Sequence, residues 1–163
     1  MGGDGERLHA WLFASEDRTP ANSSDAAVAQ ELVDNLGAVV IGRRTFDVGI
    51  GPWAGGTPFP VPCFVVTHSA RPELTAPGGG VASAVQQAAE SAGDRDVCLM
   101  RADVTQQVLA AGLLDEIRVH LVPLLLGGGT RLFEHLGDAR IELERVQVVD
   151  SPSVTHLRYR VIK

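Results

Sequence analysis

The segment AVVIGRRTF, residues 38–46, joins a short apolar run to a glycine, two arginines and a threonine. The run from Ala38 to Ile41 is small, β-branched and without polar residues, which is typical of a buried strand. Gly42 to Thr45 follow at once, and Phe46 opens a further helical stretch. A strand that leads directly into a helix is a building block of α/β folds.

Helices and strands alternate on both sides of this segment. Upstream, helical spacing of apolar residues predicts a helix over residues 25–36 that stops at Gly37. Further strands are predicted at residues 64–67 and 97–100, and further helices at 81–92 and 104–111. This alternation predicts an α/β fold with a mostly parallel sheet flanked by helices, in which 39–41, 64–67 and 97–99 are parallel and central.

The last third of the chain is rich in strands. The apolar pattern predicts strands at residues 117–126, 143–149 and 155–161, the first of them interrupted by Pro123. Residues 150–152 join the last two as an antiparallel hairpin at one edge. The whole chain is therefore predicted to form one mixed sheet in a single domain, residues 1–163.

Composition narrows the classes of partner and of site. The net charge of −6 is unfavourable for nucleic-acid binding, and no apolar stretch is long enough to cross a membrane. Cys63 and Cys98 both lie in apolar runs and the start carries no signal peptide, so we expect a reduced cytoplasmic protein. The five histidines are scattered without ligand spacing, which predicts no metal site, although His120 and His156 lie in predicted strands where one of them can face a pocket.

Four stretches carry a resemblance to a known family. They are VVIGRRTFD (39–47), PCFVVTH (62–68), QQVLAAGLLDEIRVHLVPLLLGGGTRLF (106–133) and SPSVTHLRYRV (151–161). These resemble the dihydrofolate-reductase-like family, in particular the riboflavin-biosynthesis reductase C-terminal domain (RibD C-terminal type) and its small stand-alone actinobacterial-type members. The resemblance implies an oxidoreductase of biosynthesis that transfers hydride from NADPH to a C=N, C=C or C=O bond of a small heterocyclic substrate.

The resemblance also implies where NADPH binds. It assigns the cofactor to Gly42, Arg43, Arg44 and Thr45, and its adenosine phosphate to Thr67 and His68. A glycine allows close approach of the backbone, a helix start supplies N–H donors, and arginine binds phosphate bidentately. The alternative that the two arginines are merely solvated residues at a helix start stays open.

Departures from the family's pattern indicate a degraded cofactor site. Met100, Arg101 and Ala102 stand where the family has a glycine pair that passes under the cofactor, so a backbone conformation open only to glycine is expected to be lost. The family's first strand, near the middle of the sheet, has no counterpart either, because Met1 to Gly5 is too short. A chain start upstream of Met1 would account for that absence.

The substrate side is predicted from aromatic and glycine residues. Trp11, Phe46 and Trp53 are candidates for an apolar pocket wall, with core packing as the alternative. The resemblance places Gly127, Gly128 and Gly129 beside the substrate, although a flexible turn explains them equally. Two other functions stay open: a cofactor-free enzyme that cyclises or isomerises a natural product, and a small-molecule binding protein. We also expect a homodimer that covers exposed strand edges.

Overall fold

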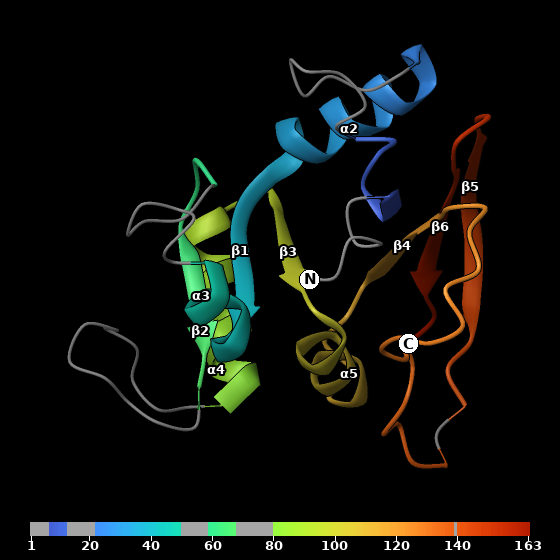
Figure 1. Cartoon of the computed structure of the whole chain (residues 1–163). Coiled ribbons are helices and arrows are strands. Elements are labelled where there is room, and N and C mark those ends of the chain that lie inside the picture. The colour runs from blue at the N-terminus through green and yellow to red at the C-terminus, as the bar shows by residue number, and fades with distance from the viewer. Residues whose placement is uncertain (1–6, 13–21, 50–58, 68–79, 139) are drawn as a thin grey trace. The chain divides into compact units, whose positions relative to one another are not determined.

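The computed structural model describes residues 7–12, 22–49, 59–67, 80–138 and 140–163 (Figure 1). They fall into two compact units. The parallel unit comprises residues 35–114 and 131–138, and the antiparallel unit comprises residues 1–34, 115–130 and 139–163. The prediction that the chain is a single domain stays a prediction.

The parallel unit is built on three parallel strands. These are β1 (Leu36–Gly42), β2 (Cys63–Val66) and β3 (Asp96–Met100), in the order β2-β1-β3 (Figure 1). β1 is buried from Gly37 to Ile41, as expected for a central strand covered on both faces. The predicted α/β class and the parallel arrangement of these three strands are confirmed.

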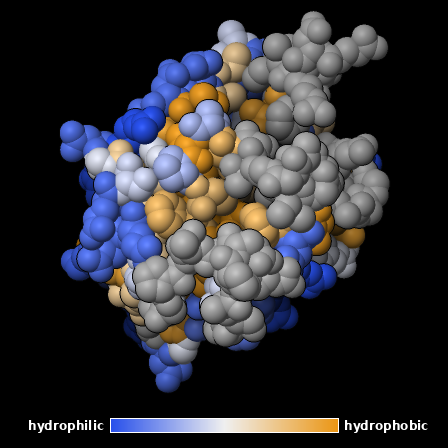
Figure 2. All heavy atoms as spheres, turned by 90° about the vertical axis from the view of Figure 1, so that its left-hand side faces the viewer, coloured by the Kyte–Doolittle hydropathy of each residue, from blue (hydrophilic) through white to orange (hydrophobic). Residues whose placement is uncertain are grey.

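Three helices accompany these strands: α3 (Arg43–Gly49), α4 (Gly80–Ala92) and α5 (Ala102–Ala110). Small and β-branched residues of α4 and α5 form a core with one face of β1; they are Ala88 and Ala92, Val104 and Val108, and Ala38 and Val40. The edge strand β2 is only half-buried. On the side of the molecule drawn in Figure 2, apolar side chains accordingly reach the surface near the middle of the face.

Gly37 corrects one prediction. It was expected to stop a helix, but α2 (Ser23–Asn35) ends before it and Gly37 lies inside β1, at a shift in register with β3. A Cβ atom at Gly37 would lie 2.7 Å from the Cβ atoms of both Ala92 and Arg95. The residue is therefore a glycine because the end of α4 passes too close for any side chain.

Replacing Gly37 with alanine should lower the free energy of unfolding by about 1–3 kcal/mol, because the new methyl group overfills this contact. Urea unfolding measures the loss. Gly128→Ala is the control, since a Cβ at Gly128 meets nothing within 4 Å. Equal stability of the two variants would show that the end of α4 moves aside without cost.

The antiparallel unit contains β4 (Glu116–Leu121), β5 (Leu143–Asp150) and β6 (Thr155–Val161), in the order β4-β6-β5. Both pairings are antiparallel, which confirms the predicted C-terminal hairpin. β4 ends at Leu121 and does not extend to residue 126 as predicted, because Pro123 has no N–H to continue the ladder.

The described strands pair as two three-stranded sheets, one parallel and one antiparallel, where the sequence predicted one mixed sheet. Among these strands β3 pairs only with β1, and β4 pairs only with β6. The family resemblance places a strand near the middle of the sheet, and none of the described strands is its counterpart. The homodimer that would cover such edges stays a prediction.

No helix in the described ranges is both long enough and apolar enough to traverse a lipid bilayer. The same ranges contain no group of three or more histidine, cysteine or carboxylate side chains positioned to hold a metal ion.

Candidate functional site

The parallel pairing brings the predicted cofactor residues to one edge of the parallel unit. Ile41 is aligned with Val65 and Met100, so β1, β2 and β3 end side by side. Ligands of α/β proteins bind at the carboxyl ends of such strands. The predicted residues at this edge are Gly42, Arg43, Arg44 and Thr45 after β1, Thr67 after β2, and Met100, Arg101 and Ala102 at β3. Their role in cofactor binding stays a prediction.

The two arginines after β1 differ in availability. α3 begins at Arg43 and not at Phe46, so both arginines belong to its first turn. Arg43 Nε donates to Asp47 Oδ1 at 2.7 Å, whereas the exposed Arg44 has no ionic partner among the described residues. Thr45 Oγ1 is buried and has no hydrogen-bond partner in that part of the chain. Arg44 is therefore the guanidinium available to an anionic ligand at this turn.

Arg101 corrects a second prediction. Its backbone has φ 91° and ψ 144°, so the conformation expected to be lost with glycine is kept by an arginine. The carbonyl of Arg101 accepts hydrogen bonds from Thr105 N at 3.1 Å and Thr105 Oγ1 at 3.0 Å. The first turn of α5 thus holds the residue in a conformation that costs an arginine about 1–3 kcal/mol.

Arg101→Gly should raise the free energy of unfolding by about 1 kcal/mol, because the released strain exceeds the greater chain entropy of glycine in the unfolded state. Urea unfolding at neutral pH measures the change. Arg101→Ala is the matched control, since it removes the same side chain and keeps the strain. A gain of equal size in both variants would assign the effect to the side chain and contradict the strain.

The charge of the residues at this edge is compatible with a phosphate-bearing cofactor. Arg44 and Arg101 are exposed, and the hydroxyl of Thr45 has an unsatisfied hydrogen-bonding capacity. The backbone at Arg101 has the form that a glycine would give it. Two features stand against the cofactor: the bulk of the Met100 and Arg101 side chains, and the lack of a counterpart to the family's first strand among the described strands.

A second polar cluster lies in the antiparallel unit. His120 and His156 are opposite each other on β4 and β6, with their Nδ1 atoms 2.7 Å apart. His156 Nε2 lies 3.0 Å from Oδ1 of Asp25, which is fully buried at the start of α2. Asp25 Oδ2 also accepts hydrogen bonds from Ser153 Oγ at 2.9 Å and Asn22 Nδ2 at 2.7 Å. Asp25, His156 and His120 thus form one hydrogen-bonded chain.

Trp11 covers this pair of histidines. It is buried, and its ring centroid lies 4.7 Å from that of His120 and 4.8 Å from that of His156. Its predicted place in a substrate pocket stays a prediction. Gly127, Gly128 and Gly129 belong to the same unit and are exposed, and Phe46 is half-buried on α3. Trp53 and His68 lie outside the described residues.

Within this hydrogen-bonded set of three residues, the surroundings shift the pKa values of Asp25 and His120. Burial raises the pKa of Asp25, but hydrogen bonds outweigh burial and hold that pKa below 3.8; the donors are His156, Ser151, Ser153 and Asn22. Burial, followed by the charges of His156 and Arg118, lowers the pKa of His120 to about 4. His120 is thus neutral under conditions in which Asp25 is ionised.

An ion-pair network lies next to the histidines on the same sheet. Arg118 and Arg158 are directly opposite, and Glu116 accepts from Arg118 Nε at 2.6 Å and from Arg158 Nε at 2.5 Å. Glu31 of α2 accepts from Arg158 Nη1 at 2.9 Å. Burial raises the pKa of Glu116, but the two guanidinium groups more than reverse this and lower it. The carboxylates offset what would otherwise be a repulsive cross-strand arginine pair.

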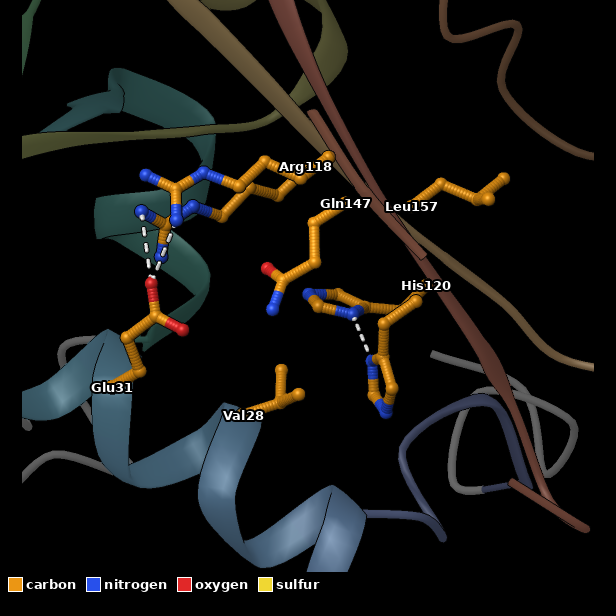
Figure 3. A pocket seen from close by; sticks show the side chains of 8 residues that line it. Val28, Glu31, Arg118, His120, Gln147 and Leu157 are labelled. Atoms are coloured by element: carbon orange, nitrogen blue, oxygen red, sulfur yellow. Dashed lines mark hydrogen bonds and ion pairs between the residues drawn. The ribbon is translucent and has the colours of Figure 1, made fainter. Parts of the chain in front are cut away.

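A small pocket lies among these groups, between the strands and α2. It measures about 20 Å³ and is lined by Val28 and Glu31 of α2 and by residues of all three strands, among them His120 and Gln147. Gln147 of β5 and His120 of β4, strands that β6 separates, both line this pocket, and Figure 3 shows Val28 facing them from α2. Sequence reasoning left this cluster almost unused. The sequence did contain a signal for this cluster. Arg118-x-His120 and His156-x-Arg158 are mirrored patterns, and an antiparallel register places like residues opposite each other.

Comparisons with known proteins agree with this architecture. The family model described as RibD C-terminal domain matches residues 4–157. A solved structure from Shewanella sp. PV-4, assigned to riboflavin biosynthesis, is 22% identical with a TM-score of 0.69, over 94% of this chain and 87% of that one. Acinetobacter baumannii RibD is 15% identical with a TM-score of 0.62, over 88% of this chain and 51% of that one.

A dihydrofolate reductase shows the same fold. The enzyme from Enterococcus faecalis, complexed with NADP(H), is 19% identical with a TM-score of 0.54, over 89% of this chain and 86% of that one. No curated protein sequence matches the chain.

Proposed function

Since the chain belongs to the RibD C-terminal domain family, we propose that it is a reductase that uses NADPH to reduce a C=N, C=C or C=O bond of a small heterocyclic substrate. The observation that carries the proposal is the carboxyl edge of the parallel unit, where the exposed Arg44 and Arg101 offer two guanidinium groups. The NADP(H) bound to the Enterococcus faecalis enzyme supports the choice of cofactor.

The proposed roles of the residues follow from their chemistry. Arg44 and Arg101 pair with phosphate oxygens, because guanidinium groups bind phosphate bidentately. The Thr45 hydroxyl is buried and a Cβ atom at Gly42 would lie 3.4 Å from Val104 Cγ2, so the two exposed guanidinium groups are the proposed contacts. When bound, NADPH supplies the hydride.

Binding of NADPH should be weak, because the side chains of Met100 and Arg101 occupy space at the edge. A well-packed site loses about 1–3 kcal/mol when it is overfilled, which corresponds to a roughly ten- to hundredfold loss of affinity. The double variant Met100→Gly/Arg101→Gly should recover that affinity. The backbone at Arg101 already has the glycine conformation, so the substitution removes only side-chain bulk and one charge.

Fluorescence or calorimetric titration with NADPH tests the proposal on the wild-type protein and the double variant. Adding Arg44→Ala to the double variant is the control, and it should weaken binding again. Saturable binding that depends on Arg44 supports the reductase. If neither protein binds NADPH, the reductase is refuted and the cofactor-free enzyme or the binding protein takes its place. The bulk of Met100 and Arg101 favours these two alternatives.

A further inference from the structure

We propose that Asp25, His156 and His120 form a proton relay that stores one proton and exchanges it through Nε2 of His120 with the small pocket between the strands and α2. The proposal concerns residues of the antiparallel unit alone. It does not depend on whether the chain binds NADPH.

The four imidazole nitrogens have different surroundings. The two Nδ1 atoms face each other at 2.7 Å, and Nε2 of His156 faces the Asp25 carboxylate at 3.0 Å. The fourth nitrogen, Nε2 of His120, has no hydrogen-bond partner among the residues that the structure describes, and His120 lines the pocket. It is therefore the nitrogen of the pair through which a proton enters and leaves.

The hydrogen bonds fix the positions of the ring protons. A carboxylate only accepts, so His156 must carry its proton on Nε2. When both rings are neutral, Nδ1 of His156 is bare and accepts from Nδ1–H of His120, which leaves Nε2 of His120 as an acceptor. A proton added at this Nε2 allows the shared proton to move onto His156. Nε2 of His120 is then a donor, and the positive charge lies beside Asp25.

The pair accommodates one added proton and resists a second. A second would place two N–H groups face to face across 2.7 Å. Burial and the charges of His156 and Arg118 act in the same direction, because they lower the pKa of His120 to about 4. The relay therefore alternates between two states that differ by one proton and by the hydrogen-bonding sense of His120 Nε2.

The charges around the pair favour one stored proton. Among the described residues of α2, β4 and β6 packed here, the carboxylates are Asp25, Glu31 and Glu116, and the permanent cations are Arg118 and Arg158. The remaining neighbours, Trp11 and Gln147, are uncharged. One imidazolium, added to the two arginines, balances the charges of the three carboxylates.

The size of the pocket identifies the exchange partner. A cavity of about 20 Å³ holds a water molecule and excludes a substrate-sized ligand. Glu31, Gln147 and the arginines give such a water polar partners besides His120. Water in this pocket is therefore the group that delivers the proton to Nε2 of His120 and removes it.

Nuclear magnetic resonance of the full chain labelled with ¹⁵N-histidine tests the relay directly. Two-bond couplings identify which ring nitrogen carries the proton. At high pH we expect His156 protonated on Nε2 and His120 on Nδ1, and after uptake of one proton we expect His120 protonated on Nε2 alone. Uptake of two protons in one step, or His120 protonated on Nε2 at high pH, overturns the proposal. This measurement needs no variant.

Asp25→Asn tests the role of the carboxylate. The amide oxygen can still accept from His156, but the negative charge is gone, so uptake of the first proton should move about 1–3 pH units lower. The matched control is His135→Asn, at an exposed histidine whose positive φ of 60° asparagine tolerates. An unchanged first uptake in Asp25→Asn overturns the proposal. If this variant does not fold, the wild-type couplings alone decide.

Discussion

Replacing Asp25 with alanine should lower the free energy of unfolding by about 3–5 kcal/mol, more than any other single change considered for this protein. Asp25 is fully buried, and its carboxylate accepts from Asn22, Ser153 and His156. Alanine leaves the buried His156 and the half-buried Asn22 and Ser153 without this acceptor, and each unsatisfied group costs free energy of its own. It also leaves any positive charge on His156 without its counter-charge.

Thermal and urea unfolding in a Trp53→Phe background measure the effect, because Trp11 is then the only tryptophan and it packs on the histidine pair. The expected decrease corresponds to about 6–20 °C in Tm. Asp34→Ala is the control, since this carboxylate is exposed and accepts only from Gln30 of the same helix among the described residues. A loss below 1 kcal/mol for Asp25→Ala would show that water replaces the carboxylate.

The strands of the parallel unit were predictable because each carries its own signal. β1 is a continuous apolar run, and burial on both faces imposes such a run. The helices α4 and α5 were predicted within two residues of their bounds, because apolar residues recur on one side of each. The position of the carboxyl edge follows from these strands, because the carboxyl ends of neighbouring parallel strands lie at the same edge of a sheet.

The histidine chain was not predictable, because it depends on register between distant segments. His120 and His156 are 36 positions apart, and Asp25 is 131 positions from His156. Asp25 also lies in the first turn of α2, where a carboxylate is favourable next to the helix N-terminus for local reasons alone. Only the pairing of β4 with β6 and the packing of α2 bring the three together. The role of Gly37 was not predictable for the same reason, because it is the approach of α4 that requires a glycine at this position.

Arg101 shows the limit of reasoning from residue type. An arginine in place of glycine predicts a changed backbone, yet α5 holds the residue at φ 91°. The buried Val104 and Val108 anchor that helix to the core. Packing of the helix therefore outweighs about 1–3 kcal/mol of local strain at Arg101.

Stability should fall by about 3 kcal/mol as the pH is lowered from 6.5 to 4, because of His120 alone. The unfolded chain protonates this histidine near pH 6.5, whereas in the folded protein burial and the nearby charges lower its pKa to about 4. Between these values unfolding takes up a proton, so acid favours the unfolded chain. The contribution is fully present above pH 6.5, lost progressively through the window, and constant below pH 4.

Urea unfolding at several pH values measures this slope, and His120→Gln should remove it, since glutamine does not titrate. The exposed His135→Asn variant should keep the slope. The carboxylates act in a different window: Asp25 and Glu116 have lowered pKa values in the folded protein, so their contribution is present above the unfolded values of 3.8 and 4.5 and is lost only as pH falls through the folded ones. If the wild-type protein lost stability only in that acid range, His120 would be in contact with solvent. Burial would then no longer explain why His120 is neutral beside Asp25 and His156.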